Sequence, residues 1–349
     1  MTEKKPKGNL TPKIFIALAI IILVALAFTG LNYYRKYFVG NVNDEGFLLI
    51  RTGSEFGAVL DSVNLKVLVK DTASFREAAV NMNFPGKVKP GRYKLTKGMS
   101  NRRIINMLKA GNQEPVKLRF HNLRLKEDFA KYVSGQIEAD STSIIHLLNS
   151  ENFVSKYGFN TENVYTMFLP NSYEMYWNTS ADKFFKRMYD EYQKFWNSGR
   201  KTKAEAISLS PIQVSILAAI VDAEALHNDE MPTIAGLYLN RYKRGQRLQA
   251  DPTVIFANRD FTIRRVLNKH LRTESEYNTY LHAGLPPGPI MMPSTSAVDA
   301  VLNFKKHSYI YMCAKEDFSG YHNFAVTQEE HSVNARKFQQ ALNQRNIKK

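Results

Sequence analysis

Residues Ile216–Glu230 read ILAAIVDAEALHNDE, an apolar helical run that takes in two carboxylates, Asp222 and Glu224. Successive residues of an α-helix are about 100° apart around its axis, so the side chains can be assigned to faces. Leu217 and Ile220 lie within about 40° of Glu224 on this helical wheel. Asp222 lies about 160° away from Glu224. Glu224 therefore occupies the apolar stripe, where a leucine or isoleucine is expected.

A carboxyl group on the apolar face of a helix needs either a partner or a proton. Burial disfavours the ionised form, so a buried glutamate can hold its proton near neutral pH. A group of that kind can act as a general acid. The sequence leaves a second interpretation open, in which Glu224 forms a buried ion pair with Arg241, Arg244 or Arg247. Asp222 needs neither explanation, because a solvated face or a structural contact accounts for it.

The segments that follow this helix gather polar side chains and rigid turns in the motifs QADPT, YNTY and GLPPGPI. Prolines in the last motif fix an extended backbone that can form one wall of a groove. Short hydrogen-bonding side chains suit the hydroxyl and acetamido groups of a sugar. We predict that a polar, sugar-sized cleft beside Glu224 is lined by Gln249, Asp251, Thr253, Asn278 and Thr279.

Capping signals mark the neighbouring elements. Ser210 and Gln213 form a predicted capping box at the start of the acidic helix, and Asp229 is the expected cap of the next helix. Two strands, YIYMCA and HNFAV, are predicted to pair around the turn EDFSG. A last helix is expected to begin at Thr327, with Glu330 completing a second capping box.

The N-terminal part of the chain predicts a membrane anchor. Residues 14–33 carry no charge, are apolar from Ile14 to Leu31 and are long enough to span a bilayer, and Tyr33 and Tyr34 at their end suit the interface. Four lysines favour a cytoplasmic tail over residues 1–13. Residues 34–45 are expected to form a polar tether, and the rest of the chain to lie in the periplasm, anchored by a single pass in the inner membrane. A cleaved signal peptide is the alternative, because Ala25–Ala27 resembles a cleavage site.

Beyond the tether, two regions are predicted. Residues 46–118 twice show a strand, a turn and a capped helix, which indicates a small α+β module. Its second helix is expected to end at Gly111. Residues 119–345 mix helices with short strands and hold the acidic helix. The predicted fold class is therefore α+β, with an N-terminal transmembrane helix, a small module and a larger mixed domain.

Composition excludes several classes of function. The chain has 349 residues, a net charge of +16 and one cysteine, Cys313. A single cysteine forms no internal disulfide, and no Cys/His spacing suggests zinc. We expect no metal and no cofactor. The positive charge favours an anionic partner, but an exported chain without nucleic-acid-binding motifs argues against nucleic acid.

The chain resembles the endolytic murein transglycosylase family, also called YceG-like proteins, most specifically in the motifs LAAIVDAEA, RLQADPTVI, YNTY, GLPPGPI and HNFAV. The resemblance implies a LysM-like module at 46–118 and a catalytic domain at 119–345. The family's catalytic glutamate falls on Glu224. Further substrate-binding residues implied by the same motifs are Tyr277, Tyr280, His322 and Phe324.

Two departures from the family pattern stand near these motifs. Asp222 and Ala223 occupy positions where members often carry Glu and Lys, which leaves the catalytic position unaffected. His331 is followed by serine instead of asparagine, which leaves a role for His331 open.

The resemblance implies cleavage of the MurNAc–GlcNAc bond in nascent peptidoglycan strands at the outer face of the inner membrane. One glutamate would act as acid and then as base, leaving 1,6-anhydro-MurNAc ends. Peptidoglycan synthases are candidate partners. Two alternatives stay open: a muramidase-type hydrolase that uses Glu224 with Asp251, and a non-catalytic, membrane-tethered peptidoglycan-binding scaffold.

Overall fold

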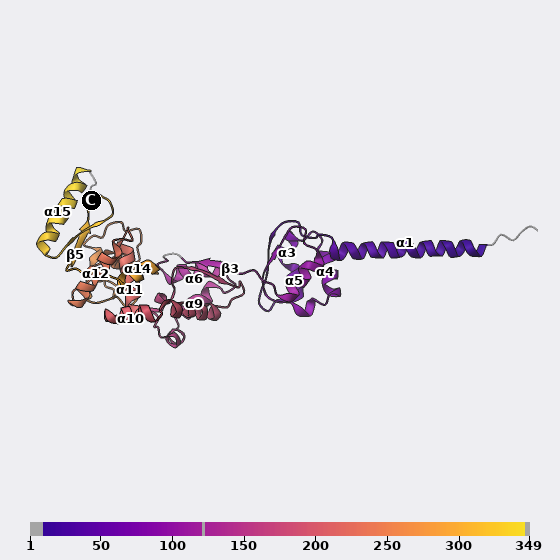
Figure 1. The fold of residues 1–349 in the computed structure, drawn as a ribbon, viewed down its shortest axis with the longest axis horizontal. Helices are drawn as coiled ribbons and strands as arrows, with labels where there is room; N and C mark the ends of the chain where they lie inside the picture. The colour runs from indigo at the N-terminus through magenta and orange to yellow at the C-terminus, as the bar shows by residue number, and fades with distance from the viewer. Residues whose placement is uncertain (1–9, 121–122, 346–349) are drawn as a thin grey trace, which may run out of the picture. The chain divides into compact units, whose positions relative to one another are not determined.

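The computed structural model describes residues 10–120 and 123–345. Helices are mixed with short two-stranded sheets (Figure 1), which confirms the predicted α+β class. The chain forms two compact units. The N-terminal unit extends to Val116 and includes residues 176–178, and the C-terminal unit holds the remainder.

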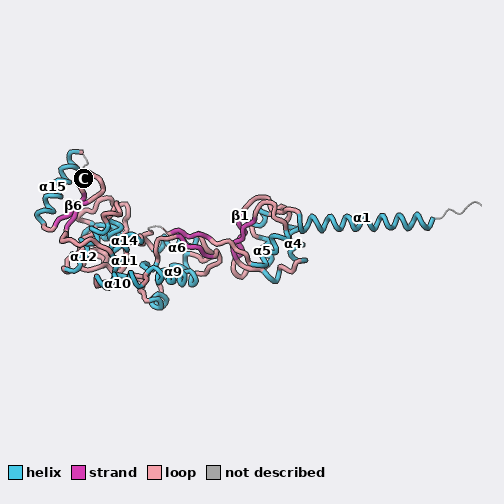
Figure 2. The backbone as a smooth tube through the Cα atoms, in the orientation of Figure 1, coloured by secondary structure: helices cyan, strands magenta, loops and turns pink. Residues whose placement is uncertain are grey.

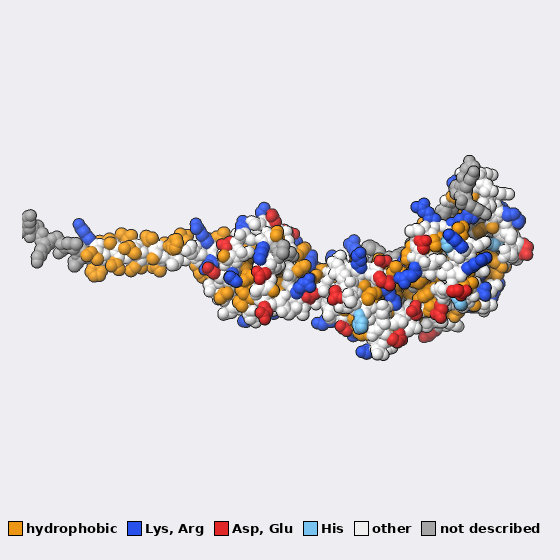
Figure 3. Space-filling view, turned by 180° about the vertical axis from the view of Figure 1, so that it is seen from behind, with side chains coloured by type: hydrophobic (Ala, Val, Ile, Leu, Met, Phe, Trp, Pro, Cys, Tyr) orange, Lys and Arg blue, Asp and Glu red, His pale blue; other side chains and the backbone are white. Residues whose placement is uncertain are grey.

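The longest helix is α1 (Leu10–Phe38), drawn in indigo in Figure 1. Its apolar side chains are exposed and form the long orange surface seen in Figure 3. The segment Pro12–Phe38 has 27 residues and a window of mean hydropathy 3.0. A helix of that length spans about 40 Å, more than the hydrocarbon core of a bilayer at about 30 Å. The helix is therefore long and apolar enough to cross a membrane.

The predicted tether at residues 34–45 is wrong in its first part, because α1 continues to Phe38 and packs against the rest of the N-terminal unit. Tyr37 is buried, and its hydroxyl accepts a hydrogen bond from Asn81 at 3.0 Å. The Asn101 side chain donates to the Lys36 carbonyl at 2.9 Å. These contacts favour helix over an open linker at the exit of the apolar segment.

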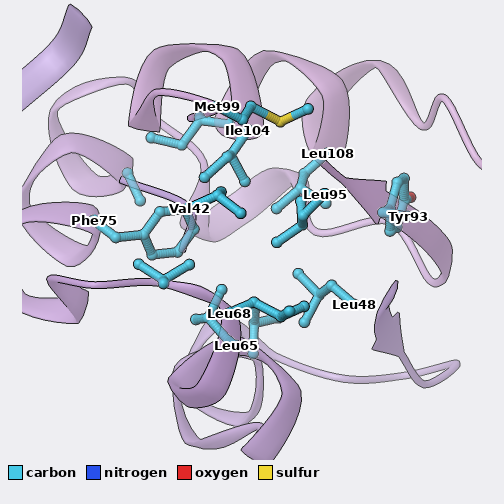
Figure 4. Close-up of a cluster of buried hydrophobic side chains, with 14 of the residues drawn as sticks. Val42, Leu48, Leu65, Leu68, Phe75, Tyr93, Leu95, Met99, Ile104 and Leu108 are labelled. Atoms are coloured by element: carbon cyan, nitrogen blue, oxygen red, sulfur yellow. The ribbon is translucent and has the colours of Figure 1, made fainter. Parts of the chain in front are cut away.

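A two-stranded antiparallel sheet and short helices form the rest of the N-terminal unit (Figure 2). The elements are β1 (Gly46–Ile50), α2 (Phe56–Asp61), α3 (Val63–Leu68), α4 (Thr72–Asn81), η1 (Pro85–Lys87), β2 (Gly91–Leu95) and α5 (Asn101–Ala110). Figure 4 shows apolar side chains from both strands and from α3, α4 and α5 meeting in one core. The helix α5 ends as predicted at Gly111, whose φ of 77° suits glycine.

The first part of the C-terminal unit has an aromatic core. Its elements are β3 (Val116–Arg119), α6 (Lys126–Ser134), α7 (Ser141–Leu148), α8 (Glu151–Val154), η2 (Ser155–Tyr157), η3 (Val164–Met167), β4 (Ser172–Met175) and α9 (Ala181–Phe195). Phe129 lies at the centre, with its ring 4.4 Å from that of Phe168 and 6.0 Å from that of Phe184. This core joins α6, α9 and the segment after η3.

The second part of the C-terminal unit is built around α11. Its elements are α10 (Ser198–Ala206), α11 (Pro211–Glu224), α12 (Met231–Lys243), α13 (Asp251–Asn258), η4 (His270–Arg272), α14 (Thr295–Leu302), β5 (Tyr311–Ala314), β6 (His322–Ala325) and α15 (Gln328–Gln344). Eight consecutive residues of α11, from Val214 to Val221, are buried. Helices α12, α13 and α14 pack around it, as expected for a helix that is apolar on all sides.

Most of the local signals in this part are confirmed. The capping boxes of Ser210 with Gln213 and of Thr327 with Glu330 are both formed. The strands β5 and β6 pair antiparallel, with Tyr311 opposite Ala325. The predicted cap of α12 is wrong, because Glu230 and not Asp229 holds the N-cap position, without a side-chain capping bond.

The close approach of α12 to the segment before β5 depends on Gly236. A Cβ at this position would lie 2.4 Å from the Lys305 carbonyl oxygen. We expect Gly236→Ala to lower the stability by about 1–3 kcal/mol, because overpacking outweighs the gain in helix propensity. The control is Gly199→Ala in α10, where the added Cβ makes only an ordinary contact at 3.5 Å. Thermal unfolding of both variants checks this, and an unchanged Tm for Gly236→Ala would contradict it.

Candidate active site

A cavity of about 420 Å³ lies in the C-terminal unit, at the end of α11. Helix α12 and the strand β5 supply two of its sides, and the segment before α13 supplies another. The residues that line it are Glu224, Leu237, Tyr238, Arg241, Leu248, Gln249, Asp251, Tyr280, Ile310, Tyr311, Met312, Cys313, Ala314, His322, Gln328 and His331. This volume is within the range of small-molecule sites and exceeds a single sugar ring.

Glu224 is the last residue of α11, and its carboxyl group faces the cavity. The Tyr238 hydroxyl donates a hydrogen bond to Glu224 Oε1 at 2.7 Å. Ala225, directly after it, is extended, so the helix stops at the point where the acid is presented. The apolar body of α11 thus fixes the backbone that carries the acid.

The pKa of Glu224 is raised from 4.5 to about 7, mainly because its surroundings desolvate the carboxylate; the Tyr238 hydrogen bond lowers this pKa, and the nearby charge of Asp251 raises it. The partial negative charge at the C-terminal end of a helix also disfavours a carboxylate. At pH 7 a large fraction of Glu224 is therefore protonated, as a general acid requires.

The ion pair considered for Glu224 is not formed, although the structure describes Glu224 and all three arginines. Arg241 donates instead to the Arg247 carbonyl at 2.9 Å, to the Ile310 carbonyl at 2.8 Å and to the Gln249 side chain. Arg241 therefore fastens the wall of the cavity to β5 and orients Gln249. Glu224 is left with Tyr238 as its hydrogen-bonding partner in the described part of the chain.

The two carboxyl groups of the opening motif have separate roles, as their positions on the wheel predict. Asp222 accepts hydrogen bonds from the Ser294 backbone N–H at 2.8 Å and from its hydroxyl at 2.9 Å. Ser294 caps α14, so Asp222 ties the end of α11 to the start of α14. Asp222 is structural, and Glu224 faces the cavity.

Asp251, the first residue of α13, lies in the same cavity as Glu224. Its Oδ1 accepts a hydrogen bond from the Tyr280 hydroxyl at 2.6 Å. Three of the predicted cleft residues, Gln249, Asp251 and Tyr280, are therefore brought together beside the acid.

His322 joins the cavity from the start of β6 and is held by a buried carboxylate. Glu230 is only 6% exposed and accepts from the His322 backbone N–H at 2.8 Å. The second Glu230 oxygen lies 2.7 Å from His322 Nδ1. This pair fixes the imidazole so that its other nitrogen is available to the cavity, and it explains why the Glu230 side chain does not cap α12.

Five predicted substrate-binding residues do not line this cavity. Thr253, Asn278 and Thr279 are buried; the two threonine hydroxyls lie 2.8 Å apart, and Asn278 donates to two loop carbonyls. They hold the YNTY loop against α13, behind the wall. The Phe324 ring packs 5.5 Å from that of Tyr309. Tyr277 lines a different cavity of the C-terminal unit.

Sequence reasoning missed Tyr238 and Glu230, which orient Glu224 and His322. It left His331 open, and the structure places this residue in the cavity, stacked 5.3 Å from the Tyr311 ring. The buried His331 Nδ1 has no hydrogen-bond partner among the described residues. Burial, together with the charge of Arg241, lowers the pKa of His331. Among the described residues, no three His, Cys, Asp or Glu side chains form a potential metal site.

A cavity with a half-buried carboxylic acid of raised pKa at the end of a core helix defines a candidate acid–base site on an α+β fold. The sequence profile of the YceG-like family matches residues 48–337, so the chain belongs to the YceG-like family.

Relatives with assigned names agree with this family. The chain is 28% identical over 225 residues to an endolytic murein transglycosylase of Bacillus subtilis strain 168, covering 64% of this chain and 56% of that protein. It is 24% identical over 313 residues to an endolytic murein transglycosylase of Streptococcus pneumoniae R6, covering 80% and 55%. The chain thus spans just over half the length of these relatives.

A solved structure has the same fold. The 2.6 Å crystal structure of a YceG-like protein from Listeria monocytogenes superimposes with a TM-score of 0.57 at 22% identity. The superposition covers 83% of this chain and 98% of that one.

The raised pKa of Glu224 predicts a stability effect with a definite sign. Between pH 4.5 and 7 the folded state holds a proton that the unfolded state has lost, so this residue makes stability fall as pH rises. We expect Glu224→Gln to be more stable than the wild type by about 1–3 kcal/mol at pH 8, with little difference at pH 4. Unfolding of the detergent-solubilised full chains of wild type and variant, at pH values from 4 to 8, measures this difference in stability. A stability difference that does not change with pH would disprove the raised pKa.

Proposed function

We propose that this protein is a membrane-anchored endolytic transglycosylase that cleaves the MurNAc–GlcNAc bond of nascent peptidoglycan strands. The observation that carries the proposal is Glu224, an acid with a pKa of about 7 in a polar cavity of a YceG-like fold. The names of the Bacillus and Streptococcus relatives support the same activity. The helix α1 anchors the chain in the inner membrane in a single pass, and the catalytic unit works in the periplasm, where the glycan strands are made.

The mechanism needs one carboxyl group in two successive roles. Protonated Glu224 donates its proton to the glycosidic oxygen, and the bond between that oxygen and C1 of MurNAc breaks. The 2-acetamido group of MurNAc stabilises the positive charge at C1. The Glu224 carboxylate then accepts the proton of the MurNAc 6-hydroxyl, and O6 closes on C1. The products are a GlcNAc end and a 1,6-anhydro-MurNAc end, and no water is consumed.

The other groups of the cavity support this sequence of steps. The Tyr238 hydrogen bond holds Glu224 in one orientation and stabilises the carboxylate that forms after the first proton transfer. His322, held by Glu230, presents a ring nitrogen that can bind a polar group of the sugar. Arg241 donates one hydrogen bond to the protein from each of its three nitrogens and keeps Gln249 in place.

The hydrolase alternative rests on Asp251, which shares the cavity with Glu224. If Asp251 activated water, the products would carry reducing MurNAc ends. The direct test is digestion of purified peptidoglycan strands by the full chain, with the product masses read by mass spectrometry. Anhydro ends support the transglycosylase, because a fragment with a new anhydro end is lighter than its hydrolysed counterpart by the mass of one water.

We expect Glu224→Gln to abolish cleavage, by about a factor of 10³ or more, because the amide cannot donate the proton. Asp251→Asn is expected to retain anhydro-forming activity and to lose no more than about tenfold. The matched control is Asp222→Asn, which changes a carboxylate on the same helix that faces away from the cavity. Full activity of a folded Glu224→Gln protein would show that Glu224 is not the general acid.

The pH dependence of cleavage follows from the state of Glu224. The acid is active when protonated, so cleavage is expected to fall as pH rises through about 7. Tyr238→Phe removes the hydrogen bond that lowers this pKa. The falling limb of the pH profile should therefore move to higher pH in Tyr238→Phe, even where the overall rate is reduced. Initial rates of cleavage between pH 5 and 9 test this shift. An unshifted falling limb would show that Tyr238 does not lower the pKa of Glu224.

A further inference from the structure

A second cavity of the C-terminal unit, about 260 Å³ in volume, is lined by an unusual density of charge. Its wall includes three cations and two carboxylates: Arg124, Lys126, Arg259, Glu127 and Glu162. Apolar and aromatic residues complete it, among them Tyr165, Phe256, Tyr277 and Pro289.

A third, smaller cavity lies beside α13, and its lining includes residues next to both the charged cavity and Glu224. This small cavity, of about 70 Å³, shares Arg124 and Phe256 with the charged cavity. The small cavity is also lined by Ala223 and Pro252, the chain neighbours of Glu224 and Asp251. The helix between Asp251 and the charged cavity has eight residues, a length of about 12 Å. An extended chain of about four residues covers that distance.

This small cavity is lined mostly by apolar residues, whereas the charged cavity and the cavity of Glu224 are lined largely by polar ones. Its walls include Ile255, Phe261, Ile290 and Met291. The last two belong to the GLPPGPI motif and its continuation, so this motif forms a wall of the second groove and not of the cavity that holds Glu224. Gly288 makes this placement possible, because a Cβ there would lie 2.2 Å from the Glu162 carbonyl oxygen.

The charges of the second cavity are only partly engaged. Arg259 pairs with Glu127 at 3.4 Å, but both side chains are more than 60% exposed, so this ion pair is weak and can exchange for a ligand. Glu162 accepts from the Tyr277 hydroxyl at 2.8 Å. Lys126 is half-buried, and its ammonium group donates to the Thr161 carbonyl. Arg124 lies over the Phe261 ring, 5.0 Å from its centroid.

Sugar rings do not account for such a site. The hydroxyl and acetamido groups of a glycan strand are uncharged, and charged protein groups are costly to desolvate without charged partners. In a peptidoglycan strand the charges are carried by the peptide on the lactyl group of MurNAc. This peptide has several carboxylates and, at its diamino acid, an amine, which match the cations and carboxylates of the second cavity. The small apolar groups next to the lactyl ether match the small, mostly apolar cavity that is lined by Ala223 and Ile255.

We propose that the groove along α13 binds the peptide attached to MurNAc, so that the enzyme selects positions of the strand that carry a peptide. This inference rests on the proposed function and adds a second recognition element to it. Glycan is bound beside Glu224, and the peptide runs along α13 to the charged cavity.

The test compares cleavage of uncrosslinked peptide-bearing strands with cleavage of the same strands after an amidase has removed the peptides. We expect the full chain to have a kcat/KM at least about tenfold higher on the peptide-bearing strands, which corresponds to about 1.4 kcal/mol. Arg259→Asn and Arg124→Gln should each lower this ratio severalfold. Asparagine is chosen at position 259 because φ is 51° there, which asparagine tolerates. The matched control, Arg265→Gln, changes an exposed arginine of the following loop and should keep the ratio.

Equal rates of the wild type on the two substrates would overturn the inference, and so would variants that lose activity on both substrates in equal proportion. Absence of cleavage on either substrate would instead count against the proposed function. In that case binding decides the inference: the Glu224→Gln protein should bind a muramyl peptide more tightly than free MurNAc, and Arg259→Asn should remove the difference. Equal binding of the two ligands would overturn it.

Discussion

The site depends on one constraint, the placement of a carboxylic acid at the end of a helix whose body is packed in the core. Residues Val214–Val221 of α11 are buried on every side, so the helix cannot rotate or slide to move Glu224 away from the cavity. The acid must remain where the packing places it, and the Tyr238 hydroxyl at 2.7 Å is the partner that the neighbouring helix offers. The protonation of Glu224 near neutral pH follows from this arrangement, because the surroundings disfavour its charge without supplying an arginine to compensate it.

Periodicity and capping signals were sufficient for several elements of this fold, although not for the end of α1 or the cap of α12. The capping boxes at Ser210 and Thr327, the strand pair β5–β6 and the different faces of Asp222 and Glu224 are all local properties, and all are present. The likeness of the N-terminal unit to a LysM module stays a prediction. The structure there has a two-stranded sheet packed with helices.

The contents of the cavity were harder to predict, because they depend on which helix faces meet. Tyr238 and Glu224 are fourteen residues apart, and nothing in either helix alone indicates that α12 turns this tyrosine toward the end of α11. The polarity of a residue did not by itself predict whether its side chain lines the cavity. Gln249 and Asp251 face the cavity, whereas Thr253 and Asn278 form hydrogen bonds with buried groups of the protein. Short polar side chains in tight loops serve both purposes, and only the fold distinguishes them. Glu230 was missed for a related reason, since its oxygens are engaged by His322, which is distant in the sequence.

The continuation of α1 into the N-terminal unit has a mechanical consequence. Because Tyr37 is buried and the Lys36 carbonyl is bound by Asn101, the apolar helix and the folded unit turn and tilt as one body. The tilt of the helix in a bilayer would then set the orientation of this unit relative to the membrane surface. Lipids that change the thickness of the membrane would change the tilt of α1. The orientation of the N-terminal unit would therefore depend on the lipid composition of the membrane.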